Sequence, residues 1–439
     1  MRREVSALTR FSDLPGLAKR TIRICVLIFQ IFTAARPKAP FGLNRTVSSA
    51  IFTPMLPPRR VALLIETSNA YARGILKGVA TYVRQHASWS ICLSESRRGD
   101  ISLAWLADWE GDGVIARIEN RTIAKYIKKL KVPAVDVSAA RLIPSLPWVE
   151  TDDAAIAQLV ADHLLERGFK QFGFCGDDRF QWSRLRQKHF ASVIRKRGLF
   201  CSVHRPFPAR SGRQESENKS IEDWLVRLPK PVGIMACYDF RGRQILSACR
   251  QNNVAVPDEV AVIGADNDTV LCELADPPLS SVSLNAPRIG YDAAALLDRM
   301  MSGEKVNPTG HLINPVGVVT RQSTDVLAID DPGVVAAVRY IRAHACDGIS
   351  VKDVLKAVPQ SRRSLETRFI KNIGRTPHDE ITRVKLNRVR RLLVESDWSL
   401  ERIAETAGFA HAGYLSTVFS QTIGVNPSAY RASNRPKTD

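Results

Sequence analysis

Residues 152–176, DDAAIAQLVADHLLERGFKQFGFCG, decide the fold of the first three quarters of the chain. Up to Gly168, apolar residues recur at the spacing of one helix face, and residues 171–175 then form a short, nearly continuous apolar run. An amphipathic helix followed at once by a buried strand is one step of a β-α-β repeat. The stretch therefore predicts a parallel sheet covered by helices.

The same alternation extends outward over about residues 60 to 325. Amphipathic helical segments such as residues 69–87 and 242–253 separate the strand-like runs. Roughly 260 residues of such repeats are too many for one compact core, so we expect two α/β lobes. The strand-like runs cover residues 61–66, 89–95, 111–117, 132–138, 171–177, 232–239 and 260–266.

Polar side chains gather where these strands end. Ligands of parallel α/β sheets bind outside the carboxyl ends of the strands. Carboxylates, amides, an arginine and aromatic rings suit a sugar, because each buried hydroxyl both donates and accepts and the rings stack on its C–H face. The alternative for each residue is helix N-capping, which Asp and Asn favour. The expected sugar-binding residues are Glu66, Asn69, Tyr71, Trp182, Arg184, Asp239 and Asp266.

After a polar linker at residues 319–333 the chain becomes helical and repeats itself. Residues 350–374 and 399–424 each contain a short helix, a turn and a second helix that ends in Phe-x-x-x-Ile-Gly. Ser350 and Ser399 are expected N-caps, and Gly374 and Gly424 are expected left-handed helix ends. This pattern predicts two copies of a helix-turn-helix about fifty residues apart.

A helix-turn-helix binds DNA when its second helix enters the major groove. Arginine can bond bidentately to guanine or neutralise a phosphate, while the second copy offers smaller polar groups. Residues 382–396 between the copies predict a rigid spacer helix. The alternative for each side chain is a solvated helix face. The expected DNA-binding residues are Arg362, Arg363, Arg368, His411, Tyr414, Ser416 and Thr417.

The net charge of +19 is unevenly distributed along the 439 residues. Residues 331–439 hold 18 basic and 11 acidic side chains, whereas residues 61–330 hold 34 and 31. The remaining excess, 11 against 2, lies in residues 1–60. A nearly neutral middle followed by a basic helical region favours a sensor joined to a nucleic-acid-binding domain.

The first 58 residues are expected to be an extension or a mis-assigned start, and residues 36–54 among them show no helical or strand period. Residues 21–35, TIRICVLIFQIFTAA, form an apolar run that resembles a secretory signal but contains Arg23 and Gln30. Three interpretations stay open: a start site assigned too far upstream, with Met55 as the true one; a disordered or targeting extension; and a cleaved signal.

Motifs for catalysis or cofactor binding are absent from the sequence. It has no P-loop, no G-x-G-x-x-G, no nucleophile elbow and no metal-ligand spacing, and its eight cysteines are scattered singly. The carboxylate pairs Asp152/Asp153 and Asp266/Asp268 suggest a sugar-modifying enzyme as an alternative. We expect a protein that is not an enzyme and needs no cofactor or metal.

Residues 60–325 resemble the sugar-sensing domain of LacI/GalR-type regulators, which has a type I periplasmic-binding-protein fold. The segments that carry the resemblance are VPDEVAVIGADND (residues 256–268) and PPLSSVSLNAPRIGYDAAALL (residues 277–297). In that family the residues after the corresponding strands hold the sugar, which implies this role for Arg184, Asp239 and Asp266. The N-terminal helix-turn-helix of that family is missing from residues 1–60.

Residues 332–433 resemble the AraC/XylS-type DNA-binding domain through SLERIAETAGFAHAGYLSTVFSQTIGVNPSAYR. A LacI-like sensor followed by this domain resembles a family of bacterial regulators of xylose use. The resemblance implies a cytoplasmic homodimer that binds operator DNA and D-xylose or a related pentose, and RNA polymerase if it is an activator. A secreted or periplasmic sugar-binding protein is the alternative. The expected segments are 1–58 (extension or mis-assigned start), 59–325 (sensor), 326–433 (DNA-binding domain) and 434–439 (tail).

Overall fold

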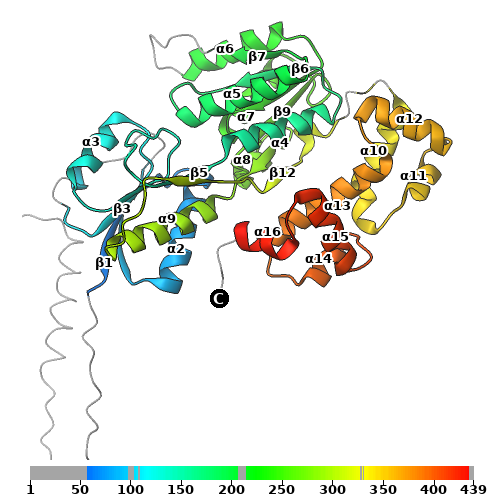
Figure 1. Ribbon diagram of the computed structural model, residues 1–439. Coiled ribbons are helices and arrows are strands. Elements are labelled where there is room, and N and C mark those ends of the chain that lie inside the picture. The colour runs from blue at the N-terminus through cyan, green and yellow to red at the C-terminus, as the bar shows by residue number, and fades with distance from the viewer. Residues whose placement is uncertain are drawn as a thin grey trace, which may run out of the picture. The chain divides into compact units, whose positions relative to one another are not determined.

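The computed structural model describes residues 57–96, 103–106, 109–205, 214–326, 329 and 331–434 (Figure 1). The interpretations of the N-terminal extension fall on residues 1–56, and nearly all of the expected tail falls on residues 435–439. Both segments lie outside the described residues.

The first lobe contains a six-stranded sheet whose neighbouring strands are all parallel. Its strand order is β11-β5-β4-β3-β1-β2. Val61 to Leu64 of strand β1, which pairs with β2 on one side and β3 on the other, are buried, as expected for a strand covered by helices on both faces. The strands are β1 (Arg59–Leu64), β2 (Trp89–Leu93), β3 (Gly113–Ala116), β4 (Ala134–Asp136), β5 (Trp148–Thr151) and β11 (Gly310–Ile313).

The second lobe contains another six-stranded sheet, in the order β12-β10-β9-β8-β6-β7. All neighbouring pairs are parallel except β10 and β12. The two sheets confirm the predicted two-lobed α/β fold. The strands are β6 (Gln171–Cys175), β7 (Cys201–His204), β8 (Val232–Ala236), β9 (Val260–Ala265), β10 (Ser280–Ser283) and β12 (Gly317–Val319).

The chain passes between the two lobes three times. It leaves the first sheet after β5, returns after β10 to add β11, and goes back to the second sheet as β12. Sequence patterning does not indicate β11, because Ile313 is the only buried residue among its four. The two lobes are therefore joined by three segments that lie far apart in the sequence.

Helices surround these sheets, and several begin at a side-chain cap. Asn69, Asn120, Asp152 and Asp268 accept hydrogen bonds from backbone amides of the helices that follow them. The helices are α2 (Ala70–His86), α3 (Arg121–Lys129), α4 (Asp153–Leu165), α5 (Gln181–Lys196), α6 (Gln214–Arg227), α7 (Asp239–Gln251), α8 (Thr269–Glu273) and α9 (Ala286–Met301), with short 3-10 turns η1 (Ala104–Leu106) and η2 (Gln322–Thr324).

Two glycines allow helices α2 and α9 to pack closely. A Cβ atom at Gly78 would collide with the backbone of Pro287, and one at Gly290 would collide with the backbone of Ile75. A larger residue at either position would force the helices apart. This contact ties the start of the first lobe to the segment that returns from the second.

The C-terminal domain is entirely helical among its described residues and has two separate cores. Leu365 and Phe369 belong to the first core, and Leu415 and Phe419 occupy the matching positions of the second. Gly374 and Gly424 end their helices with φ of 79° and 84°. The predicted helix-turn-helix repeat is confirmed. The helices are α10 (Pro332–His344), α11 (Val351–Ala357), α12 (Arg362–Ile373), α13 (Pro377–Glu395), α14 (Leu400–Thr406), α15 (Ala412–Ile423) and α16 (Pro427–Asn434).

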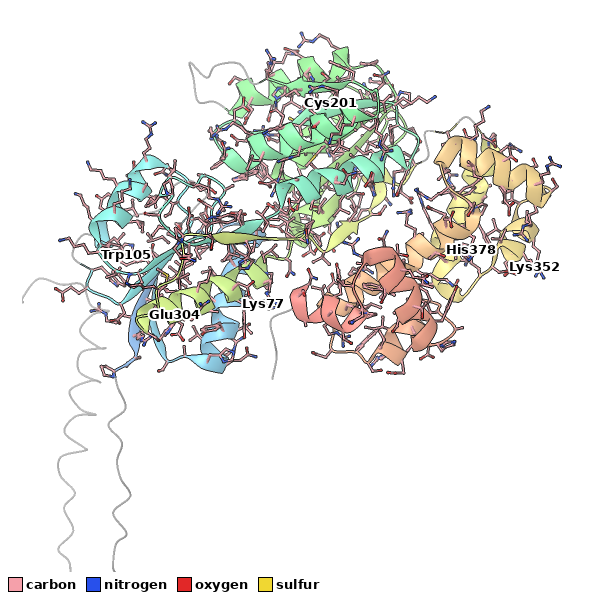
Figure 2. The ribbon with its side chains drawn as sticks, viewed as in Figure 1. Lys77, Trp105, Cys201, Glu304, Lys352 and His378 are labelled. Atoms are coloured by element: carbon pink, nitrogen blue, oxygen red, sulfur yellow. The ribbon has the colours of Figure 1, made fainter. Side chains whose placement is uncertain are left out.

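The predicted N-caps are also found where the sequence places them. Ser350 and Asp353 form a capping box at the start of α11, and Ser399 accepts a hydrogen bond from the amide of Arg402 at the start of α14. Helix α13 joins the two halves, as expected for the spacer. In Figure 2, Lys352 on α11 and His378 in the first turn of α13 mark the first half of this domain.

Candidate functional site

A buried polar cluster lies at the carboxyl ends of β1, β3 and β5 in the first lobe. Arg117, 3% exposed, donates to Glu66 at 3.2 Å and to Glu119 at 2.6 Å. Tyr71 donates to Glu150 at 2.6 Å and shares a hydrogen bond of 2.9 Å with Thr151. We call these residues, together with Asp136 and Arg141, the first-lobe cluster.

The pKa values of Asp136 and Arg141, which complete this cluster, are shifted from their ordinary values by burial. Burial raises the pKa of Asp136 to about 7, although the amide of Ser138 donates to its Oδ1 at 2.9 Å. Burial lowers the pKa of Arg141, whose guanidinium lies over the Trp148 ring. Burial also raises the pKa of Glu150. A buried carboxyl that stays protonated near neutral pH can donate as well as accept, as sugar hydroxyls require.

A second buried cluster lies at the carboxyl ends of β8 and β9. Arg186 donates to Asp153 at 2.8 Å and to the carbonyl of Cys237 at 2.6 Å, and it lies 3.9 Å from Asp266. Asp239 accepts from Ser281 Oγ at 2.5 Å. Burial, and then the neighbouring Asp266, raise the pKa of Asp239. We call Asp153, Arg186, Asp239, Asp266 and Ser281 the second-lobe cluster.

The backbone at the end of β9 is held in a left-handed conformation. Asp266 has φ of 108° and Asn267 has φ of 48°, values that cost of order 1–3 kcal/mol for residues other than glycine. The amide of Asp266 donates to Val282 at 3.1 Å, and the amide of Asn267 donates to Ser281 Oγ at 3.0 Å. The strand β10 therefore enforces this strained turn, which is common at ligand sites.

The two lobes contact each other next to the clusters. Arg73 on α2 lies 3.8 Å from Asp268, which follows β9. Asp153, the first residue of α4, comes directly after β5 and Asp152. Burial raises the pKa of Asp153 to about 6, and the charge of Glu119 in the first-lobe cluster contributes to this rise. A charge in the first-lobe cluster therefore affects the protonation of a carboxyl group in the second-lobe cluster.

Five buried side-chain atoms in and beside the first-lobe cluster have no hydrogen-bond partner among the described residues. Buried polar groups are normally satisfied, and an unsatisfied one costs about 1–3 kcal/mol. Three of these atoms belong to donors and two to carboxyl groups, a mixture that matches the donor and acceptor capacity of hydroxyl groups. The atoms are Asn69 Nδ2, Arg117 Nε, Asp136 Oδ2, Arg141 Nη1 and Glu150 Oε2.

The structure brings most of the sequence-predicted ligand residues together. Glu66 and Tyr71 lie in the first-lobe cluster, and Asp239 and Asp266 lie in the second. Asn69 caps α2 through its Oδ1, while its Nδ2 is one of the unsatisfied atoms. The ring of Trp182 is buried, and the Arg186 guanidinium lies 5.1 Å from its centre.

Arg184 is not part of either cluster. It is exposed, donates to Gln181 at 3.0 Å, and also bonds to the carbonyl of Asp178. Arg186 instead supplies the buried guanidinium, because α5 begins at Gln181 and Arg186 lies one turn beyond Trp182 on the same face. Arg117 directly follows β3, and Asp136 is the last residue of β4. The rule that ligands bind at the carboxyl ends of parallel strands could therefore have indicated both residues.

The second candidate surface is the exposed side of α12 and α15. Arg362 and Arg363 are exposed in the first turn of α12, and Arg362 pairs with Glu366 at 2.8 Å. His411 caps α15 by accepting from the amide of Tyr414, and Tyr414 and Thr417 are exposed. Thr367, exposed at the position of α12 that corresponds to Thr417, was not indicated by sequence reasoning.

Arg368 and Ser416 are less accessible than the other predicted DNA-binding residues. Arg368 donates from Nε to Asp331 at 2.6 Å and from Nη1 to Gln360 at 2.9 Å. It thereby ties α12 to the N-cap of α10. Ser416 is only partly exposed beside the buried Leu415. Because Asp331 binds the Arg368 guanidinium, this side chain does not extend freely from the exposed face of α12.

Helix α4 also contacts the DNA-binding domain at its other end. Glu166, the C-cap of α4, lies 2.7 Å from Arg383 and 3.4 Å from Arg375. Both arginines also pair with Glu380, which is 1% exposed. Burial raises the pKa of Glu166. One helix therefore contacts the second-lobe cluster at its first residue and the DNA-binding domain at its last turn.

Comparison with protein families finds three matching models. Residues 60–154 match the XylR N-terminal domain, residues 161–324 a periplasmic binding protein-like domain, and residues 354–433 a helix-turn-helix domain. Within the part of the chain that the structure describes, no helix is long and apolar enough to cross a membrane.

Relatives of this chain match it over nearly their whole length. The xylose operon regulatory protein of Escherichia coli K12 is 34% identical over 85% of this chain and 97% of its own length. The protein of that name from Haemophilus influenzae is 30% identical over 85% of this chain and 98% of its own. A solved structure described as the xylose-binding transcription activator XylR is 33% identical, covers 86% of this chain and 99% of its own, and has a TM-score of 0.55.

Proposed function

The chain belongs to the family of xylose operon regulatory proteins, and we propose that it binds D-xylose or a closely related pentose and regulates genes of pentose use in response. The observation that carries this proposal is the set of five unsatisfied buried donors and acceptors at the strand ends of a chain that also contains two helix-turn-helix motifs. A pentose can satisfy such groups with its hydroxyls.

The proposed partners follow from the same arrangement. Two recognition helices joined by α13 suit successive major grooves of operator DNA, about 34 Å apart. We propose a homodimer, as is usual for regulators that bind repeated half-sites. DNA as the partner supports a cytoplasmic location, and RNA polymerase is a further partner if the protein activates transcription.

The two alternatives have weaker support. A secreted sugar-binding protein would have no use for a DNA-binding domain. An enzyme that used the two carboxylate pairs would need these groups free to act on a substrate. Asp152 and Asp268 instead cap helices, and Asp153 pairs with Arg186. These side chains already have structural roles.

A panel of monosaccharides in a thermal-shift assay tests the proposed effector. A ligand present at a hundred times its Kd stabilises the native state by about 2.7 kcal/mol, so we expect Tm to rise by several degrees with D-xylose. Mannitol at the same concentration serves as the control for nonspecific stabilisation. A panel in which no pentose exceeds mannitol would contradict the proposal.

Helix α4 is the proposed route from sugar to DNA. It spans about 20 Å at 1.5 Å per residue and is ion-paired to Arg186 at one end and to Arg375 and Arg383 at the other. A ligand that shifts Asp153 and Arg186 would also displace Glu166. The position of the DNA-binding domain would then depend on sugar occupancy.

Glu166→Gln is expected to uncouple these two ends. Sugar affinity should stay within about twofold, because Glu166 lies far from both clusters, while the sugar-induced change in DNA affinity, typically 5- to 150-fold, should largely disappear. Calorimetry with D-xylose and fluorescence anisotropy with operator DNA measure the two quantities. Glu304→Gln is the control: Glu304 is labelled in Figure 2, and the substitution removes a carboxylate from an exposed ion pair with Arg299. Normal sugar-dependent DNA binding in Glu166→Gln would rule this route out.

A further inference from the structure

A cavity of about 790 Å³ lies beside the Glu166 contact and is strongly basic. Residues from α4, from the β12–η2 segment, and from α10 and α13 form its wall. Among the described residues that line it, Asp325 is the only carboxylate. Five arginines line the same space: Arg167, Arg321, Arg339, Arg342 and Arg383.

Arg167 is a buried charge whose hydrogen bonds go to neutral groups. It is 3% exposed and donates to the carbonyls of Thr324 at 2.6 Å and His163 at 3.0 Å, and to Thr320 Oγ1 at 3.5 Å. Burial, and then the charge of Arg342, lower its pKa well below the ordinary value. Among the described residues Arg167 forms no ion pair, and the charges of Glu166 and Asp325 only partly oppose the lowering of its pKa. Burying such a charge is costly, so an anion bound nearby would be favoured.

The charge of Arg342 is also only partly balanced by nearby carboxylates. Its Nη2 is buried without a hydrogen-bond partner among the described residues. Its nearest carboxylate is Glu380 at 3.8 Å, which already pairs with Arg375 and Arg383 at 2.7 Å. Burial lowers the pKa of Arg342 as well.

Apart from Asp325, the remaining described wall adds donors. Arg321 donates to the carbonyl of Leu279 and to Asn267 Oδ1, both at 3.0 Å and both neutral. Burial holds the pKa of His163 well below its ordinary value, so this imidazole is neutral and bonds to Thr324 Oγ1 at 2.8 Å. Arg339 is exposed at the rim.

We propose that this cavity binds a small phosphate monoester of the sugar-phosphate class. Planar guanidinium groups match phosphate oxygens bidentately, and a dianion would compensate Arg167 and Arg342. The volume exceeds what one phosphate needs and lies in the range of small-molecule sites, which leaves room for an organic part. The ligand would contact the sensor through Arg167 and Arg321 and the DNA-binding domain through Arg342 and Arg383. It would therefore stabilise the contact between them from a site separate from the two pentose-binding clusters.

The test compares D-ribose 5-phosphate, D-xylose and inorganic phosphate on the full chain, with ionic strength held constant by sodium chloride. We expect ribose 5-phosphate to raise Tm and to bind measurably in calorimetry. Inorganic phosphate should bind more weakly than the ester, and the affinity for D-xylose should stay nearly unaltered when the arginines are changed. Arg342→Gln should weaken ester binding about 10- to 100-fold, since a hydrogen bond to a charged group contributes about 1.5–3 kcal/mol.

Arg250→Gln makes the same charge change at an exposed ion pair with Asp276 and should not alter ester binding. If Arg342→Gln folds poorly, Arg339→Gln at the rim replaces it. No ester binding in calorimetry, or unchanged affinity in the cavity variants, would overturn the proposal. Equal affinity for inorganic phosphate would overturn the assignment to a sugar phosphate. A failed D-xylose response with intact ester binding would instead count against the pentose proposal alone.

Discussion

Arg186→Met is expected to abolish the response to sugar and to destabilise the protein. The substitution removes the guanidinium that joins Asp153, Asp266 and the carbonyl of Cys237. Breaking a buried ion pair by removing one partner costs about 3–5 kcal/mol, because the remaining charge is left uncompensated. Sugar affinity should fall more than about 100-fold, which corresponds to the loss of roughly two charge-assisted hydrogen bonds. Calorimetry with D-xylose and thermal unfolding measure the two effects.

Two further variants make this result specific. Arg184→Met removes the same kind of side chain two residues earlier, where it is exposed, and should leave sugar affinity nearly unchanged. Arg186→Lys keeps the charge but not the fork geometry, and it should fold better than Arg186→Met while still binding sugar weakly. If Arg184→Met loses sugar binding and Arg186→Lys keeps it, the second-lobe cluster is not the pentose site.

The double substitution Arg362→Ala and Arg363→Ala is expected to weaken DNA binding and to reduce its salt dependence. Both side chains are exposed at the start of α12, where a recognition helix meets the groove. Each phosphate contact contributes about 0.9 to the slope of log affinity against log salt concentration, so losing two should lower the slope by about 2. Affinity near physiological salt should fall about 10- to 1,000-fold. Fluorescence anisotropy over a series of salt concentrations measures both.

Arg368→Ala is the matched control within the same helix. Because Arg368 pairs with Asp331, we expect it to lower stability while leaving the salt slope of DNA binding unchanged. An unaltered slope in the double variant, or a reduced slope in Arg368→Ala, would mean that the first helix-turn-helix presents a different face to DNA.

Much of the architecture was predictable because local patterns carry it. Apolar runs at strand length and amphipathic segments at helix spacing repeat along the sensor, and side-chain caps and glycine ends mark both helix-turn-helix copies. Five of the described strands were missed, because each is only three or four residues long and carries little apolar pattern: β5, β7, β10, β11 and β12. The ends of the strands pointed to Glu66, Tyr71, Asp239 and Asp266 because position after a parallel strand is itself a structural rule.

By itself, the sequence determined the alternation of strands and helices in the sensor, its two-lobed form, the repeated DNA-binding motif and the polar character of the strand ends. Only the tertiary structure decided which arginine of α5 is buried, since a difference of two residues on a helix turns the side chain to the opposite side. It also decided that Arg368 pairs with Asp331 and that α4 contacts the second-lobe cluster at one end and Arg375 and Arg383 at the other. These contacts join residues tens to hundreds of positions apart. Their geometry depends on how whole elements pack, which no local pattern encodes.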